Sequence, residues 1–168
     1  MVKLVEYTED LKIQTLKWIK SFFGFHGSLI SDIEPEDEQN FSITEETLAE
    51  WLKNPSKLYI IISGDTAVGF LRLSFKGSNV AWIEDIFVDK AYRNKGIATN
   101  AIKIAESIIK DNSEYTAICL DVVPRNAAAL RLYHKLGYDT LSIITVRKEL
   151  YENNRDLKFD FNGIEFKY

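Results

Sequence analysis

The clearest candidate for chemistry in this chain is a short run that combines two cations, a glycine and a small residue, Arg93 to Ala98 (RNKGIA). It lies between a predicted strand and a predicted helix. The first turn of a helix leaves backbone N–H groups without internal partners, and the helix dipole adds positive charge there. Gly96 permits backbone conformations closed to other residues, and Arg93 and Lys95 add mobile charge. The run therefore favours an anion such as a phosphate or pyrophosphate, although many loops of this kind are simply solvated.

The elements on either side of this run are well marked. Trp82 to Val88 is apolar, aromatic and β-branched, which predicts a strand in the middle of a sheet. From Ile97 onward, apolar residues recur at spacings of three and four, which predicts an amphipathic helix. Its two apolar rows are Ile97, Ala101, Ile104 and Ile108, and Ala98, Ile102, Ala105 and Ile109. An abrupt strand-to-helix turn would therefore place the glycine and the cations at the start of the helix.

The order of the residues in this run resembles the acetyl-CoA signature of the GNAT superfamily of N-acetyltransferases: Arg, two residues, Gly, one residue, Ala, after a strand ending in Phe-Val. A second segment, Asn126 to Tyr138, resembles the same superfamily, with Asn, an Ala three residues further on, Leu-Tyr, and a closing Leu-Gly-aromatic. Two motifs in the right order are more specific than either alone. The resemblance covers Leu58 to Tyr138 well and the ends poorly. It departs at Lys90, where many members carry Pro.

This resemblance implies an α/β sandwich around a mixed central sheet, and acetyl-CoA as the co-substrate of an N-acetyltransferase that works by direct transfer in a ternary complex. With one Cys and two His, the sequence offers no metal-ligand cluster. The residues that the resemblance assigns to cofactor binding are Ile86, Phe87, Val88, Arg93, Asn94, Lys95, Gly96, Ile97, Ala98, Thr99, Asn126, Ala129 and Tyr133.

Two adjacent carboxylates, Glu84 and Asp85, lie in the central strand. An alkyl amine has a pKa of about 10.4, so acetyl transfer at neutral pH needs a base or a proton path. Because strand side chains alternate between faces, only one of the two carboxylates can face the acceptor unless a bulge intervenes. Members of the superfamily often carry a proton-accepting carboxylate here, and we favour Glu84 slightly over Asp85. The alternative is an ordinary ion pair or an acid that anchors the substrate.

Tyr133 lies about two turns into the helix that Asn126 is predicted to cap, on the face it shares with Ala129 and Leu136. A buried tyrosine hydroxyl needs a hydrogen-bond partner. In the superfamily the matching tyrosine donates to the CoA sulfur, which would help the thiolate to leave. The alternatives are a core tyrosine bonded to a backbone carbonyl and, for Asn126, a capping role alone. His134 is expected on the opposite, solvated face of this helix.

The composition bounds the remaining possibilities. A chain of 168 residues with 46% hydrophobic and 27% charged residues fits a single domain, residues 1–168, with a real core. A net charge of -4 argues against a nucleic-acid binder. We expect no membrane span and no signal peptide, and the single cysteine, Cys119, fits a reducing cytoplasm.

Strands are predicted over Val2 to Tyr7, over a hairpin turned at Gly64-Asp65, and over Tyr115 to Val123 and Leu141 to Val146. A first helix should fade between Gly24 and Gly27. A capping box at Ser42 to Glu45 predicts the start of a second helix. With the central strand and its two neighbouring helices, this order gives an α/β sandwich around a mixed sheet.

The tail, Leu157 to Tyr168, predicts a hairpin turned at Asn162-Gly163, because a type I′ turn needs positive φ at both positions. One face would carry six apolar residues, and the other would place like charges opposite each other with opposite charges on the diagonal. Such a face must dock either on this chain or on a second subunit, which leaves a monomer or a homodimer open.

Two functions are compatible with these observations. One is an N-acetyltransferase for a small-molecule or peptide amine. The other is a non-catalytic acyl-CoA-binding sensor or interaction module on the same fold. The acceptor itself is not encoded in the motifs. Five carboxylates between Asp32 and Glu38, beside Phe22, Phe23 and Phe25, would attract a cationic amine, unless they form only a solvated acidic loop.

Overall fold

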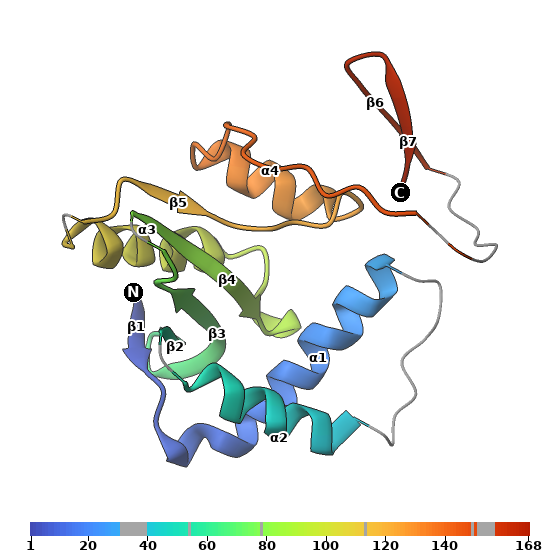
Figure 1. Ribbon diagram of the computed structural model, residues 1–168. Helices are drawn as coiled ribbons and strands as arrows, with labels where there is room; N and C mark the ends of the chain where they lie inside the picture. Colours follow the sequence, from blue (N-terminus) through green and yellow to red (C-terminus); the bar gives the residue numbers. More distant parts are fainter. Residues whose placement is uncertain (31–39, 54, 78, 113, 149, 151–156) are drawn as a thin grey trace. The chain divides into compact units, whose positions relative to one another are not determined.

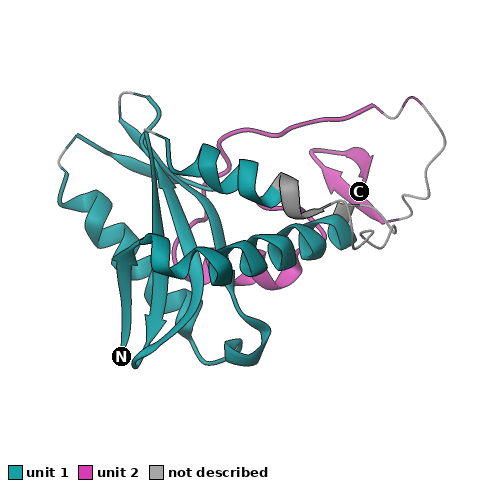
Figure 2. Ribbon diagram, turned by 90° about the horizontal axis from the view of Figure 1, so that it is seen from below, with its two compact units in different colours: residues 1–121 teal, residues 122–168 magenta. Residues whose placement is uncertain are grey.

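The computed structural model describes residues 1–30, 40–53, 55–77, 79–112, 114–148, 150 and 157–168. The chain divides into two compact units, Met1–Asp121 and Val122–Tyr168, coloured separately in Figure 2. Each unit is described by itself below.

The first unit contains a five-stranded mixed sheet in the order β1-β2-β3-β4-β5 (Figure 1). Neighbouring strands are antiparallel except β4 and β5, which are parallel. The strands are β1 (Val2–Glu6), β2 (Ser56–Ser63), β3 (Thr66–Ser74), β4 (Val80–Val88) and β5 (Ala117–Cys119). The predicted mixed α/β sheet, its central strand and the hairpin at Gly64-Asp65 are confirmed.

Helices cover both faces of this sheet (Figure 1). One face packs against α1 (Lys12–Ile30) and α2 (Asn40–Trp51). The core on that side is aliphatic and aromatic: Leu16, Trp18, Ile19, Phe22, Leu48, Trp51, Leu58, Ile60, Phe70 and Phe87. Short 3-10 turns, η1 (Glu9–Leu11) and η2 (Lys90–Tyr92), precede α1 and follow β4.

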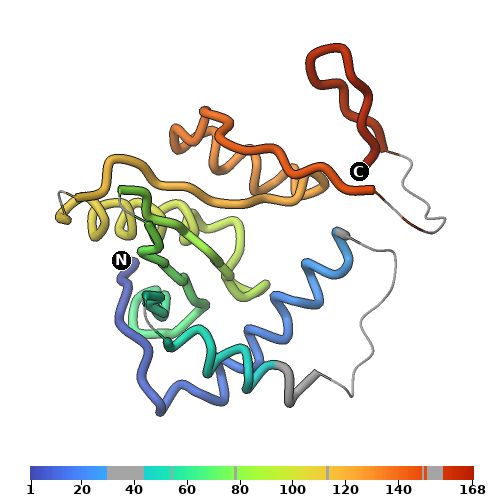
Figure 3. Tube along the Cα trace, in the orientation of Figure 1, coloured from blue at the N-terminus to red at the C-terminus, as the bar shows by residue number. Residues whose placement is uncertain are grey.

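The other face of the sheet is covered by α3 (Ile97–Lys110), which begins at the predicted residue. Its buried residues are Ile97, Ala101, Ile102, Ala105 and Ile109, drawn from both predicted apolar rows. Alternation along β3 turns Leu71 and Leu73, both fully buried, to this side. Figure 3 follows the chain from β4 through the intervening turn into α3. The amphipathic pattern therefore identified both the helix and the side that it buries.

A glycine sets the contact between β3 and β4 near this turn. Gly69 lies opposite Val88 in the antiparallel ladder. A Cβ atom at Gly69 would stand 2.0 Å from the carbonyl oxygen of Phe87, which is main chain and cannot swing away. The two strands can run this close because residue 69 has no side chain.

Two helix boundaries differ from the prediction. α1 does not fade at Gly24–Gly27 but continues to Ile30. A glycine inside a helix costs only about 1 kcal/mol, and the ring contacts of Phe22 with Phe70 and His26 hold this part of the helix in place. α2 begins at Asn40 rather than at the predicted capping box, Ser42 to Glu45. Residues three positions apart are also neighbours inside a helix, so this pair does not by itself mark where a helix begins.

Strand predictions were less accurate around the second unit. β5 spans only Ala117–Cys119 of the predicted Tyr115 to Val123. Residues 141–146 have no regular secondary structure, so the predicted strand is wrong. β-branched residues favour a strand only where a neighbouring strand is available to pair with them, and none of the described strands pairs with this segment.

The second unit contains α4 (Ala127–Lys135) and a two-stranded sheet of β6 (Lys158–Phe161) and β7 (Ile164–Lys167). The tail hairpin has the predicted register, with Phe161 opposite Ile164 and Phe159 opposite Phe166. Asn162 and Gly163 have φ of 55° and 78°, as a type I′ turn requires. The expected diagonal attraction is present, with Lys158 Nζ 2.8 Å from Glu165 Oε1.

The docking of the tail and the single-domain assignment both stay predictions.

Among the residues that the structure describes, no helix combines the length and the apolar character needed to cross a membrane.

Candidate functional site

The two carboxylates of β4 lie at a β-bulge. Arg72 of β3 lies opposite Asp85, but the next pair is Leu73 with Ile83, so Glu84 is an extra residue on β4. The bulge breaks the alternation, and both carboxylates turn toward the same guanidinium. Arg72 Nη2 lies 2.6 Å from Asp85 Oδ2 and 3.7 Å from Glu84 Oε2. The sequence predicted that only one acid would face the acceptor unless a bulge intervened. The structure has that bulge, and both acids share one face.

Asp85 is held firmly. Arg72 Nε also donates to Asp85 Oδ2, at 2.6 Å, while Arg72 Nη1 donates to Ser56 Oγ at 3.3 Å. The guanidinium lies over the Trp51 ring, 4.8 Å from its centroid. Burial raises the pKa of Asp85, and the Arg72 charge offsets only part of this effect. Asp85 is thus occupied by a largely buried ion pair with Arg72.

Glu84 has a looser environment. Its Oε1 accepts from Lys76 Nζ at 3.2 Å. The Glu84 side chain is 23% exposed, against 12% for Asp85, and the Lys76 side chain is 60% exposed. A lysine in solvent can swing away at little cost, whereas the Arg72 fork cannot. Glu84 is therefore the more available of the two carboxylates.

Aromatic side chains of α1 and α2 line this face of the sheet. The His26 ring lies 4.4 Å from the Phe22 ring, and Phe25 contacts the same histidine. Burial lowers the pKa of His26, while the Asp85 charge opposes that shift. Through Phe22, which contacts both His26 and Phe70 of β3, the C-terminal half of α1 packs on the sheet face that carries the carboxylates.

Sequence reasoning missed Arg72, Trp51 and His26 as members of this cluster. For Arg72 a signal was present, because it is the only charged residue in β3 and has apolar residues on either side. A charge in that setting needs a buried partner. Which acid would be the partner depends on the register between β3 and β4, and the sequence does not display that register.

The predicted anion-binding run forms the turn between β4 and α3. The Asp89 carboxylate caps the start of η2, accepting from Ala91 N at 3.0 Å and from Trp18 Nε1 at 3.3 Å. Gly96 is the N-cap of α3, has a φ of 71°, and makes no side-chain capping bond. The first helical bond runs from Asn100 N to Gly96 O, at 3.1 Å. The amides of the first turn are therefore presented without a side-chain cap.

The two cations of this turn both contact its main chain. Arg93 Nε donates to Val88 O at 2.9 Å, and its guanidinium lies 5.4 Å from the Phe87 ring and 5.5 Å from the Phe25 ring. Lys95 Nζ donates to Ala91 O at 3.1 Å. Both side chains fold back on the turn and so place positive charge beside it.

The remaining predicted residues of the first unit are continuous with this turn. Phe87, Val88 and Ile97 are buried, whereas Ile86, Ala98 and Thr99 are partly exposed and Asn94 is exposed. Asn94 has a φ of 61°, a second left-handed residue in the turn. The structure thus brings the end of β4, the turn and the first turn of α3 together as one surface.

The other predicted residues belong to the second unit. Asn126 caps α4 as expected, its Oδ1 accepting from Ala129 N at 3.2 Å. Tyr133 is partly rather than largely buried, and its ring contacts the Tyr138 ring edge-on at 6.1 Å. His134 is exposed, in agreement with its predicted solvated face.

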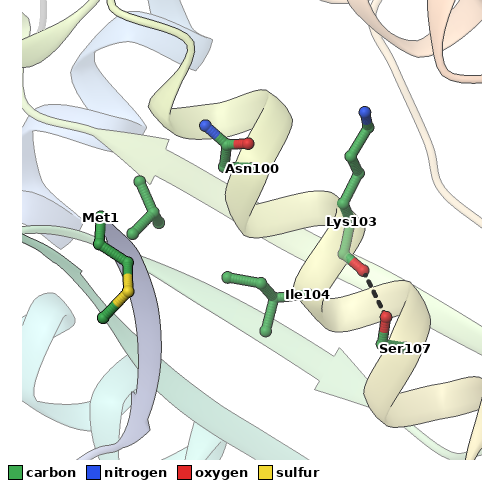
Figure 4. A pocket seen from close by; sticks show the side chains of 6 residues that line it. Met1, Asn100, Lys103, Ile104 and Ser107 are labelled. Carbon is green, nitrogen blue, oxygen red and sulfur yellow. Dashed lines mark hydrogen bonds between the residues drawn. The ribbon is translucent and has the colours of Figure 1, made fainter.

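An open hollow of about 420 Å³ lies between β1 and α3 (Figure 4). It is lined by Met1, Val2, Asn100, Lys103, Ile104 and Ser107, none of which is a predicted site residue. The hollow follows the flank of α3, whereas the carboxylates lie on the sheet face covered by α1 and α2. It is therefore separate from the candidate site.

Comparison with protein families matches residues 16–138 to the acetyltransferase (GNAT) family. The chain therefore belongs to the GNAT acetyltransferase family, as its two motifs indicated. Comparison with curated proteins found no match.

Solved structures share the fold at low identity. A transcriptional regulator from Bacillus halodurans C-125 is 20% identical, with 89% of this chain and 100% of that chain covered and a TM-score of 0.68. AAC(6')-Iy, in complex with the bisubstrate analogue CoA-S-monomethyl-acetylneamine, is 20% identical over 89% and 99% of the chains, with a TM-score of 0.62. The aminoglycoside acetyltransferase meta-AAC0020, from an uncultured soil metagenomic sample, is 16% identical over 89% and 97%, with a TM-score of 0.61. At these identities the likeness establishes the GNAT fold.

Proposed function

We propose that this chain is an acetyl-CoA-dependent N-acetyltransferase that transfers an acetyl group directly to a primary amine in a ternary complex. The observation that carries the proposal is the environment of Glu84, a partly buried carboxylate at the β4 bulge with a primary ammonium 3.2 Å from its Oε1. A base that takes a proton from an amine must reach that amine at hydrogen-bond distance. The Lys76 contact has this geometry.

The turn before α3 fits the phosphates of acetyl-CoA, which supplies an activated thioester when bound. A Cβ atom added at Gly96 would meet only Asn100 Nδ2, at 4.0 Å, so the space beside the glycine is open. The uncapped amides of α3, with Arg93 and Lys95 nearby, would bind the pyrophosphate. We assign Asn94 and Ile97 to Thr99 to the same contact, and Ile86 to Val88 to the arm that leads away from it.

In the proposed reaction Glu84 accepts the proton of the acceptor ammonium. Asp85 acts through its contact with Arg72, because that contact occupies the carboxylate and fixes the guanidinium against Trp51. Tyr133, the matching tyrosine of the family motif, would donate a proton to the departing thiolate. Asn126 and Ala129, at the start of the same helix, are assigned to the cofactor arm.

A small cationic or peptide amine is the proposed acceptor. Two similar structures are aminoglycoside acetyltransferases, which supports a small-molecule amine. The Trp51 ring lies beside the Arg72 guanidinium and the Phe25 ring beside that of Arg93, and rings of this kind suit the apolar part of such a molecule. The acidic segment between Asp32 and Glu38, predicted to attract cations, lies outside the described residues.

The test is release of free thiol from acetyl-CoA in the presence of a panel of amines. We expect turnover with at least one primary amine, and a kcat that falls about 100-fold or more in Glu84→Gln. The acidic limb of the rate–pH profile should flatten in the same variant. An unchanged kcat in a chemistry-limited assay would remove Glu84 from the reaction.

A non-catalytic acyl-CoA sensor is the second candidate. One observation favours it, because each carboxylate already has a cation beside it, Arg72 for Asp85 and Lys76 for Glu84. Calorimetric binding of acetyl-CoA, without thiol release for any amine in the panel, would support this candidate over the enzyme.

A further inference from the structure

The lysine beside the proposed base is itself a primary amine of the kind that an N-acetyltransferase modifies. Lys76 lies in the turn after β3, and its Nζ is 3.2 Å from Glu84 Oε1. This is the position that the proposed function assigns to the nitrogen of the acceptor. We propose that Lys76 is an intramolecular acetyl acceptor, modified by bound acetyl-CoA when no external amine is present. The inference rests on the proposed function.

Other lysine–glutamate pairs in the described residues show what is particular about this one. In the pairs Lys12–Glu9, Lys53–Glu50, Lys57–Glu6 and Lys158–Glu165 the glutamate side chain is 56–73% exposed. The Glu84 side chain is only 23% exposed. Lys76 and Lys158 are equally accessible, at 60% and 59%. Lys76 therefore combines an ordinary accessibility with a carboxylate partner that is unusually shielded from water.

Glu84 can accept a proton from Lys76 because Arg72 pairs mainly with the other carboxylate. Arg72 Nη2 lies 3.7 Å from Glu84 Oε2, but the guanidinium makes its two short contacts, each 2.6 Å, with Asp85 Oδ2. Glu84 Oε1, the other oxygen, faces Lys76. Arg72 thus neutralises mainly Asp85, and Lys76 is the cation nearest to Glu84 among the residues that the structure describes.

Acetylation of Lys76 needs acetyl-CoA as its only co-reactant. The Lys76 ammonium gives one proton to Glu84, and the freed Nζ lone pair attacks the thioester carbonyl carbon. An N–C bond forms at Nζ and the C–S bond breaks. The second nitrogen proton goes to the departing thiolate, so the products are an acetylated Lys76 and free CoA thiol, and Glu84 returns its proton to solvent.

The experiment follows acetylation of the full chain, incubated with acetyl-CoA and no amine, by peptide mapping with mass spectrometry. Lys76 should gain one acetyl group about 100-fold faster than Lys158, the lysine matched for exposure, because proximity and the base act only on Lys76. Glu84→Gln should slow Lys76 to the rate of Lys158 and leave Lys158 unchanged. The fraction modified per unit time should not depend on protein concentration. In Lys76→Arg the fast acetylation should disappear.

Other outcomes overturn the inference. Similar rates at Lys76 and Lys158, or no effect of Glu84→Gln, would mean uncatalysed acetylation by the thioester. A rate that rises with protein concentration would mean transfer between molecules. A preparation that acetylates external amines but leaves Lys76 unmodified contradicts this inference and leaves the proposed function intact. A preparation that does neither, while its melting temperature shows it to be folded, contradicts both.

Discussion

The two helices that carry the family motifs begin in opposite ways. α3 begins at Gly96, in the left-handed region and without a side-chain cap, so its first amides are presented to solvent. α4 begins at Asn126, whose carboxamide accepts from the Ala129 amide and so satisfies part of that helix end from within. An uncapped helix start keeps its positive potential for a ligand, whereas a capped start uses part of it for stability.

The start of a helix thus serves two different purposes in this chain. At α3 the backbone itself is expected to act, and side chains are secondary. At α4 the backbone is occupied, so the expected contribution to the reaction comes from a side chain further along, Tyr133.

Gly96→Asp should abolish acetyl-CoA binding measured by calorimetry. An aspartate adds negative charge against the phosphates, and it tolerates the φ of 71° about as well as asparagine does. Gly96→Asn is the matched control, because asparagine tolerates positive φ and carries no charge, as neighbouring Asn94 already illustrates. The Asn variant should keep binding within about tenfold of the original. Wild-type affinity in the Asp variant would contradict the assignment of α3.

Tyr133→Phe should lower kcat by about 100-fold and leave the affinity for acetyl-CoA unchanged, since only the proton donor is removed. Tyr138→Phe, which removes a hydroxyl from the ring that contacts Tyr133, is the control and should have a much smaller effect on kcat. Steady-state kinetics and calorimetry on both variants are needed. If affinity falls and kcat does not, α4 binds the cofactor as α3 is proposed to do. That result would contradict the proposed difference between the two helices.

Asn126→Ala should reduce the free energy of unfolding by about 1 kcal/mol, because the Ala129 amide loses its acceptor. Affinity for acetyl-CoA should change by less than about fivefold, equivalent to about 1 kcal/mol. Asn126→Asp keeps an acceptor and should retain most of the stability. Denaturant unfolding separates the two variants, and an equal loss in both would show that the cap is not what stabilises α4.

Arg93→Ala should weaken acetyl-CoA binding by no more than about fivefold, because one exposed charge contributes at most about 1 kcal/mol. Its guanidinium already lies over Phe87 and Phe25, and the backbone amides of α3 remain. Calorimetry at two salt concentrations checks this, with the difference from wild type shrinking at high salt. A loss as large as that of Gly96→Asp would shift the recognition of the anion from backbone to side chain.

Features with a local cause were predictable from the sequence. The strand around Trp82 to Val88, the helix from Ile97, the cap at Asn126 and the Asn162-Gly163 turn all depend on neighbours within a few residues. The same holds for the family, because both motifs are short and continuous. These features are the ones that the structure and the comparisons confirm.

What the sequence could not supply depends on long-range pairing. The bulge at Glu84 follows from how β4 pairs with β3, and it joins Arg72 to two acids at least twelve residues away in the chain. The segment 141–146 has strand composition but pairs with no described strand. Composition identifies residues able to form a strand, whereas pairing decides whether they do.

Gly69 has a consequence for the mutational tolerance of the chain. Because a main-chain oxygen of Phe87 fills the space where a Cβ would go, even alanine would have to push β3 and β4 apart. In α1, by contrast, a Cβ at Gly27 would meet nothing within 4 Å, and helical alanine is preferred to glycine. A random-mutagenesis library selected for new acceptors should therefore retain glycine at position 69 and readily accept alanine at position 27. The same residue type would therefore be retained at one position and replaced at the other.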